Sequence, residues 1–169
     1  NWEDRTTCIL FGDGAGAAVL SATAPGKGGL GPCTLGSDGS LSELLMIPAG
    51  GSRIPVTEAV LREHSNCIRM SGQEVFKHAV NNMTQTARRL LAEAGWTAED
   101  LNLVIPHQAN RRILEAIRNR GGVPEDHVFV NVDRYGNTSA ASIGIALDEA
   151  VRGGKLHPGD KVMLLAFGA

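Results

Sequence analysis

Several hallmarks of common protein classes are missing from this chain of 169 residues. No apolar run is long enough to span a bilayer, which argues against a membrane protein. The formal net charge of -2 argues against a partner such as nucleic acid or an anionic membrane, because proteins that bind them carry excess cations. With 43% hydrophobic and 20% charged residues, residues 1–169 are expected to fold as one globular domain.

Cysteine is also scarce, with three residues at Cys8, Cys33 and Cys67. The count is odd and the spacing matches no metal-binding or redox pattern, so we expect neither a disulfide framework nor a metal site. Unpaired thiols of this kind are typical of a reducing compartment, which predicts a cytoplasmic protein.

The most informative stretch begins with residues 101–106, a short apolar run that ends at Pro106. His107 follows at once, and apolar residues at helical spacing begin soon afterwards. This order predicts a buried strand, a tight turn and an amphipathic helix, and it places the histidine where ligands bind in α/β sheets. The nearby helix N-terminus disfavours the imidazolium, so we expect a neutral ring that donates one N–H. A surface histidine in a turn is the alternative.

Near the start of the chain, residues 7–11 and 15–20 are predicted to be strands. Between them, Gly12-Asp13-Gly14 suits a hairpin turn that requires positive φ. The glycine spacing and the absence of a following helix argue against a phosphate-binding loop. Residues 22–69 are rich in Gly, Pro and Ser and have no sustained period, which predicts a long connection of the kind that forms lids or substrate-facing loops.

A helix is predicted from residue 72 to about residue 94. Ser71 and Glu74 have the spacing of a capping box, and Gly95 is expected to end the helix. The apolar stripe of this helix is expected to pack in the core.

The second half of the chain continues the alternation of strands and helices. Residues 128–130 and 161–167 are predicted strands, and a helix is expected to open near Asn137 and to run to about residue 151. This order predicts an α/β fold with a mixed, mostly parallel sheet and helices on its faces. His107 and Asn137 then follow consecutive strands, so their N–H groups are expected to converge on one oxygen that becomes negative during a reaction. A structural cap is the alternative for the asparagine.

Four motifs carry a family resemblance, at residues 11–20, 106–110, 136–142 and 166–168. Their residues are FGDGAGAAVL, PHQAN, GNTSAAS and AFG. In content, order and separation they resemble the β-ketoacyl-acyl-carrier-protein synthase III family, over nearly the whole chain. The match corresponds to the C-terminal half of that enzyme, within the thiolase-like superfamily.

The resemblance implies a cytoplasmic acyltransferase that initiates fatty acid biosynthesis by a decarboxylating Claisen condensation. In that family an acyl group from acyl-CoA, usually acetyl, is loaded on a cysteine, and malonyl-acyl carrier protein loses carbon dioxide to give the attacking enolate. His107 and Asn137 match the catalytic residues that donate hydrogen bonds to the malonyl thioester oxygen. No cofactor and no metal are implied, because CoA and carrier-protein thioesters are substrates.

Further binding residues follow from the same resemblance. Those that match positions along the acyl-CoA and pantetheine path are Phe11, Gly72, Phe76, Asn110, Phe167 and Arg5. Those that match the surface that receives acyl carrier protein are Gln108, Ala109, Asn110, Arg111, Arg112 and Lys77. A solvated helix face is the alternative for the arginines.

The chain departs from the family pattern in its nucleophile. The family's cysteine belongs to an N-terminal half that is not in this sequence, and none of the three cysteines lies at a strand-to-helix elbow. By the same resemblance, the family's last strand is also expected to be missing. We therefore expect this chain to be inactive alone and to act with its own N-terminal half, in an intact enzyme that is a homodimer.

Two other functions stay open at this point. A related condensing enzyme of polyketide or quinolone type would use the same two donors with a different tunnel. A non-catalytic module that docks carrier protein would use the same surface without the chemistry. A Cys/His hydrolase is not expected, because no cysteine neighbours His107 in the pattern.

Overall fold

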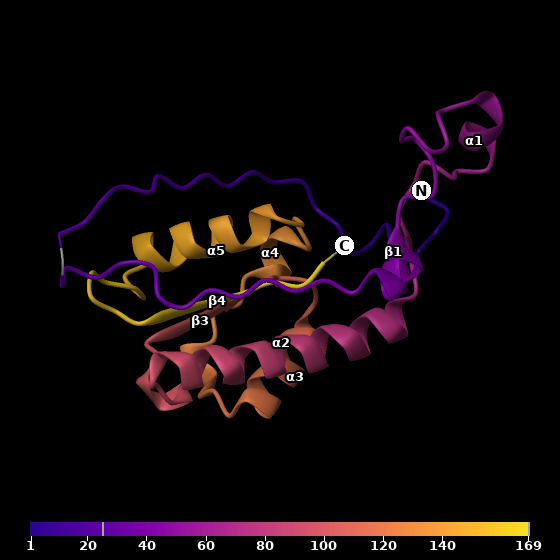
Figure 1. Ribbon diagram of the computed structural model, residues 1–169. Coiled ribbons are helices and arrows are strands. Elements are labelled where there is room, and N and C mark those ends of the chain that lie inside the picture. Colours follow the sequence, from indigo (N-terminus) through magenta and orange to yellow (C-terminus); the bar gives the residue numbers. More distant parts are fainter. Residues whose placement is uncertain (25, 169) are drawn as a thin grey trace.

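The computed structural model describes residues 1–24 and 26–168. Its centre is a parallel pair of strands, β3 (Leu103–Pro106) and β4 (Val162–Leu165), in register from the first residue of each to the last. The helices α2 (Gly72–Ala94) and α3 (Arg111–Gly121) cover one face of this pair, and α5 (Ala141–Arg152) covers the other (Figure 1). The predicted α/β fold with helices on both faces of a parallel sheet is confirmed.

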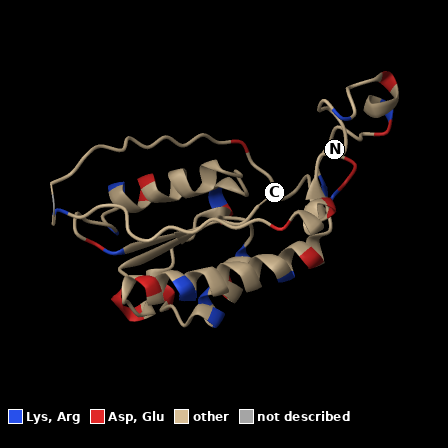
Figure 2. Ribbon diagram, viewed as in Figure 1, with Lys and Arg blue, Asp and Glu red and all other residues tan. Residues whose placement is uncertain are grey.

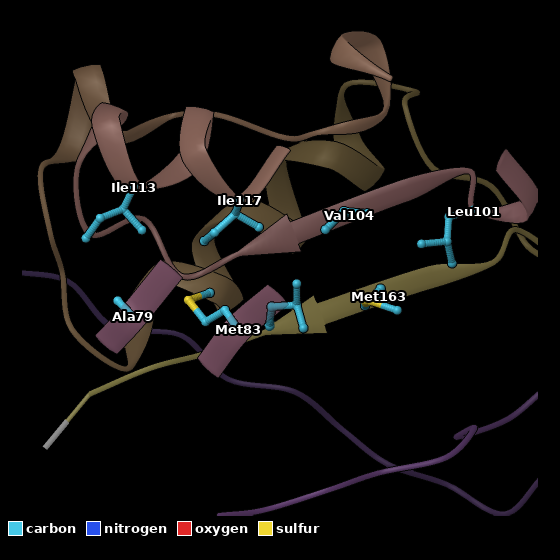
Figure 3. Close-up of a cluster of buried hydrophobic side chains, with 8 residues drawn as sticks. Ala79, Met83, Leu101, Val104, Ile113, Ile117 and Met163 are labelled. Carbon is cyan, nitrogen blue, oxygen red and sulfur yellow. The ribbon is translucent and has the colours of Figure 1, made fainter. Parts of the chain in front are cut away.

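Strand β3 is buried at all four positions, so its alternating side chains supply two separate cores. Leu103 and Ile105 point to α5 and pack with Ala146 and Ala150, which are fully buried. Val104 points to the opposite face and joins the cluster under α2 and α3 (Figure 3). The buried members of that cluster are Ala79, Met83, Leu101, Val104, Ile113, Ile117, Met163 and Leu165.

Helix α2 has the predicted length, and Gly95 ends it in the left-handed conformation with φ 68°. The predicted capping box is wrong, because the Ser71 side chain makes no cap hydrogen bond. The Ser71 backbone N–H instead donates to Leu44 O at 2.8 Å, which leaves the Glu74 carboxylate without the donor that a capping box requires. Glu74 forms an ion pair with Lys77 at 3.6 Å.

The predicted hairpin near the start of the chain is also wrong. Residues 1–10 form turns, Phe11 makes an isolated parallel bridge with Asn137, and residues 12–20 are extended without a strand partner among the described residues. In Figure 1 this part of the chain is the indigo trace that runs along α5. A hairpin would need positive φ at its turn, and neither Gly12 nor Gly14 has it.

The glycines in this part of the chain allow it to lie close to another segment of the protein, and they do not form a turn. Gly12, Gly14 and Gly16, which we call the glycine seam, lie against residues 135–145, which comprise the segment before α5 and the start of that helix. A Cβ at Gly12 would collide with the carbonyl oxygen of Tyr135, and one at Gly16 would lie 3.1 Å from the Cα of Gly144. The alternation of glycine therefore reflects one side of an extended backbone that packs against another backbone at Gly12 and Gly16, and against side chains at Gly14.

Residues 22–69 are mostly irregular, as predicted, and contain only short elements in the part that the structure describes. These are a 3-10 helix (Gly39–Leu44), β1 (Leu45–Met46), α1 (Glu58–Arg62) and β2 (Arg69–Met70), with β1 and β2 paired antiparallel. Helix α1 lies apart from the layered body (Figure 1). A role of this connection as a lid stays a prediction.

Two predictions after α3 require correction. The predicted strand 128–130 reduces to a single parallel bridge between Val104 and Val128. The short helix α4 (Val132–Tyr135) follows, and α5 begins only at Ala141, with Ala140 at its N-cap. Asn137 is therefore not a helix cap. Its backbone belongs to the bridge with Phe11, which holds this segment extended before the helix.

Among the described residues, no helix combines the length and the apolar character that crossing a membrane demands. Two further 3-10 helices, Ala98–Asp100 and Glu125–His127, complete the connections.

Candidate active site

His107 lies directly beyond the end of β3, as predicted. Its backbone N–H donates to Leu165 O at 2.7 Å, which extends the β3–β4 ladder by one residue and fixes the backbone of the histidine to the sheet. The ring is half-buried, and its Nδ1 lies 2.6 Å from the Oγ of Ser142 in the first turn of α5. The sheet and α5 therefore hold the imidazole from two sides.

The Ser142 hydroxyl is the hydrogen-bond partner of the His107 ring, and it bears on which ring nitrogen carries the proton. This side chain is 2% exposed, and its Oγ accepts the Gln108 backbone N–H at 3.2 Å. Because Oγ already accepts this N–H, we assign its own proton to the hydrogen bond with Nδ1 of His107. A hydroxyl that donates to Nδ1 selects the tautomer with N–H at Nε2, so His107 presents a donor beyond the strand end.

The charge state of the ring follows from its burial. Burial disfavours the imidazolium and lowers the pKa of His107 below its ordinary value of 6.5. The ring is therefore neutral at neutral pH, which agrees with the expectation from the sequence. A neutral ring with its proton on Nε2 is a hydrogen-bond donor that does not remove a proton from the group it binds.

Asn137 is held by its backbone and by its side chain. Its N–H donates to Leu10 O at 2.8 Å, and its carbonyl oxygen accepts the Gly12 N–H at 3.0 Å. Its Oδ1 accepts the Ser139 N–H at 2.9 Å, and Ser139 adopts a left-handed φ of 52°, which is unusual for a residue with a side chain. With Oδ1 occupied, the Nδ2 group is the part of the amide that is left to donate.

The two predicted donors are thus attached to one short segment, residues 137–142. Ser139 orients the amide of Asn137, and Ser142 orients the ring of His107. Local strain at a residue such as Ser139 is typical of functional sites, where the surrounding structure maintains it.

The other predicted substrate-binding residues are spread over several elements. Phe11 is paired with Asn137, and Phe76 and Phe167 are partly buried against the core under α2 and α3. Gly72 is the first residue of α2, and Arg5 is exposed in the turns at the start of the chain. Only Phe11 is joined to the donor segment by a hydrogen-bonded bridge within the described structure.

Asn110 has a structural role that the sequence analysis did not identify. It is the N-cap of α3, and its Oδ1 accepts the Ile113 N–H at 3.0 Å. This bond fixes the first turn of the helix that follows His107. Its Nδ2 group is the part that could contact a ligand.

The residues predicted to receive a carrier protein differ in exposure. Arg111, Arg112 and Lys77 are exposed, and Figure 2 shows basic and acidic residues interspersed over α2 and α3. Gln108 is 1% exposed, so its side chain does not lie on this surface. Ala109 is half-buried.

The buried Gln108 side chain connects three segments. Its Nε2 donates to Pro106 O at 2.8 Å and to Phe129 O at 3.1 Å, and its Oε1 accepts the Asn131 N–H at 2.9 Å. Sequence reasoning missed these contacts, because a glutamine in a turn gives no signal that distinguishes a buried connector from a surface residue. The same is true of Ser142, which lies within a run of small residues.

No group of His, Cys, Asp or Glu in the described residues is arranged to hold a metal ion. The arrangement offers instead a neutral N–H donor at His107, beyond the end of β3, and an amide N–H donor at Asn137, in the extended segment before α5. Such donors can stabilise an oxyanion that forms during acyl transfer or decarboxylation.

Sequence and structure comparisons show which known proteins this chain is similar to. The family model described as 3-oxoacyl-[acyl-carrier-protein (ACP)] synthase III C terminal matches residues 91–169, and the model described as 3-oxoacyl-[acyl-carrier-protein (ACP)] synthase III matches residues 1–39. Two curated relatives named β-ketoacyl-[acyl-carrier-protein] synthase III are similar. The protein from Caldanaerobacter subterraneus subsp. tengcongensis is 51% identical over 100% of this chain and 51% of its own length. The protein from Roseiflexus castenholzii is 52% identical over 99% of this chain and 51% of its own length.

A solved structure supports the same fold. The β-ketoacyl-[acyl carrier protein] synthase III of Thermus thermophilus superposes with a TM-score of 0.86 and 44% identity, covering 100% of this chain and 51% of that chain. The fold is therefore that of a thiolase-like enzyme. The chain belongs to the 3-oxoacyl-[acyl-carrier-protein] synthase III family, a family of acyltransferases, and it spans about half the length of the curated relatives that it matches.

Proposed function

We propose that this chain supplies the enolate-stabilising half of a decarboxylating condensing enzyme that joins an acyl group from acyl-CoA to malonyl-acyl carrier protein. The observation that carries the proposal is the attachment of His107 and Asn137 to residues 137–142. Ser142 directs the His107 proton to Nε2, and Ser139 leaves Nδ2 of Asn137 to donate. Family membership supports the choice of reaction.

The proposed chemistry depends on two N–H donors that bind one thioester oxygen. The malonyl thioester carbonyl would accept Nε2–H of His107 and Nδ2–H of Asn137. Loss of carbon dioxide leaves its electron pair in the enolate, whose oxygen these donors stabilise. The enolate carbon then bonds to the carbonyl carbon of an acyl group held on a cysteine, and the cysteine leaves as the thiolate. A neutral imidazole suits this step, because an imidazolium would protonate the enolate.

The nucleophilic cysteine is proposed to come from the family's other half. Cys8 and Cys67 lie in turns, and Cys33 is exposed in an extended segment, so none occupies a helix N-terminus. The chain alone is therefore proposed to form no acyl-enzyme. Its N-terminal half, acyl carrier protein, acyl-CoA and a second copy in a homodimer are the proposed partners. The reducing setting expected from the cysteines stays a prediction.

Exposed cations are proposed to receive the acidic carrier protein. Arg112 has no acidic partner among the described residues, whereas Arg111 pairs with Glu115 at 3.2 Å and Lys77 pairs with Glu74 at 3.6 Å. Of these three cations, Arg112 is therefore the one whose charge is least compensated by its own chain, and it is proposed as the centre of the docking surface.

The test is malonyl thioester decarboxylation by a complete synthase whose C-terminal half is this sequence. Replacing His107 or Asn137 with alanine should lower the rate by about 10² to 10³, the usual effect of removing one preorganised donor. The control is His157→Ala, because among the described residues the side chain of this exposed histidine pairs with Asp160 alone, at 3.6 Å. Near-normal decarboxylation by His107→Ala would contradict the proposed role. Condensation with malonyl-CoA in place of the carrier protein should be unchanged by Arg112→Glu, which separates docking from chemistry.

A further inference from the structure

Both loops that carry the proposed donors are connected to one carboxylate on α5. Glu149 accepts a hydrogen bond from Asn131 Nδ2 at 2.7 Å, two from the Arg134 guanidinium at 2.8 Å each, and one from the Tyr135 hydroxyl at 2.7 Å. The two carboxylate oxygens share these donors equally. Oε1 accepts from Arg134 and Tyr135, and Oε2 accepts from Asn131 and Arg134.

One arm of this network reaches His107. Asn131 is 2% exposed, and its backbone N–H donates to the buried Oε1 of Gln108 at 2.9 Å. Gln108 is the residue after His107, and its own backbone N–H donates to Ser142, the residue that orients the imidazole. Movement of Asn131 would therefore be transmitted to the turn that holds the ring.

The other arm reaches Asn137. Arg134 and Tyr135 end helix α4, and only Gly136 separates them from Asn137. Gly136 has φ 68°, and a Cβ there would lie 3.1 Å from Leu10 O, so this turn is confined against the first segment of the chain. The hydrogen bonds of Glu149 with Arg134 and Tyr135 thus fix the end of α4, from which the chain continues to Asn137.

We propose that Glu149 is a positioning residue that sets the placement of His107 and Asn137 together, through Asn131–Gln108 on one side and Arg134–Tyr135 on the other. This inference rests on the proposed function. The carboxylate is suited to the task because α5 is anchored by fully buried alanines against β3, so its position is set by the core. Hydrogen bonds from Asn131, then Tyr135 and Arg134, lower the pKa of Glu149, so it stays ionised and accepts all four bonds at neutral pH.

The substitution Glu149→Gln tests the network with little change of shape. An amide has one oxygen, so two of the four donors would face an NH2 group that cannot accept from them. Asp148→Asn is the matched control. It removes the same charge from the adjacent residue, whose carboxylate, within the part of the chain that the structure describes, accepts hydrogen bonds from Arg152 alone on the exposed side of α5.

In the complete synthase, we expect Glu149→Gln to lower the decarboxylation rate at saturating malonyl thioester by about 10- to 100-fold, with a smaller change in KM, because displaced donors lose transition-state stabilisation. Asp148→Asn should change the rate by less than about twofold. In a His107→Ala, Asn137→Ala background, Glu149→Gln should add almost nothing, because its effect acts through those side chains. An equal added loss in that background would overturn the proposal.

A second measurement does not depend on activity. The 15N resonances of the His107 ring and of the Asn137 side-chain amide should shift in Glu149→Gln and stay in place in Asp148→Asn. If Glu149→Gln misfolds, Tyr135→Phe removes a single bond to the same carboxylate and should produce a smaller shift and a roughly two- to fivefold slower rate.

The outcomes separate this inference from the function on which it rests. Activity that survives His107→Ala contradicts the proposed function, whereas the shifts of both resonances would still support the network. The opposite case is a decarboxylation rate that falls in His107→Ala but is unchanged per folded molecule in Glu149→Gln. If both 15N resonances also stay in place in Glu149→Gln, the positioning role alone is overturned.

Discussion

The two parts of this chain are stabilised in different ways. From α2 onward, the residues form layers with their own buried cores on both faces of β3. Before α2, the buried apolar residues among those described are only Ala49 and Val60, and Val19 is 95% exposed. The first part nevertheless provides the bridge that holds Asn137. A poorly packed segment can thus determine the geometry of a site whose stability comes from elsewhere.

The largest expected effect tests where the stability comes from. Ile105 is completely buried between β3 and α5, so Ile105→Ala should lower the free energy of unfolding by about 2–5 kcal/mol. Val19→Ala, which removes a smaller but also apolar group from the exposed segment, should change it by less than about 0.5 kcal/mol. Urea unfolding followed by circular dichroism measures both. Equal effects would mean that the first segment is packed as well as the second.

A smaller effect is expected where the two parts touch. A methyl group at Gly12 would collide with the Tyr135 carbonyl, so Gly12→Ala should cost about 1–3 kcal/mol and increase hydrogen exchange at the Asn137 amide. Gly31→Ala is the matched control, because nothing lies within 4 Å of the position of its added Cβ. This control should leave the Asn137 amide protected. Loss of protection in both variants would argue that the glycine seam is not a specific contact.

The smallest expected effect concerns pH. Burial lowers the pKa of His107, so its ring should titrate below the ordinary value of 6.5 when followed by NMR. The unfolded chain takes up this proton near pH 6.5 and the folded chain only at lower pH. Stability should therefore fall as the pH falls through 6.5, and this loss should level off below the folded pKa. A His107 midpoint above 6.5 would contradict the burial argument.

The layered part was predictable because its signals are local. The apolar stripe of α2, the run that ends at Pro106 and the glycine after each helix are short-range patterns with one common structural outcome. The position of His107 after a parallel strand followed from the same patterns. The orientation of its ring did not, because the partner hydroxyl of Ser142 is distant in sequence and resembles its small neighbours.

The errors lie where distant segments decide the local structure. Gly12-Asp13-Gly14 has the composition of a hairpin, but its glycines permit backbone packing against the loop before α5. Ser71 has the type and spacing of a capping residue, but its backbone N–H donates a hydrogen bond to the carbonyl oxygen of Leu44. In each case a tertiary contact replaced the local preference, and nothing in the neighbouring residues indicates that contact.

The bridge between Phe11 and Asn137 has a consequence for the order of folding. It joins segments far apart in the sequence, so closing it costs more loop entropy than a contact between neighbouring segments. The sheet and its helices can assemble from neighbouring segments beforehand. We therefore expect the amide of Asn137 to acquire its final orientation late in folding, after the scaffold around His107 has formed.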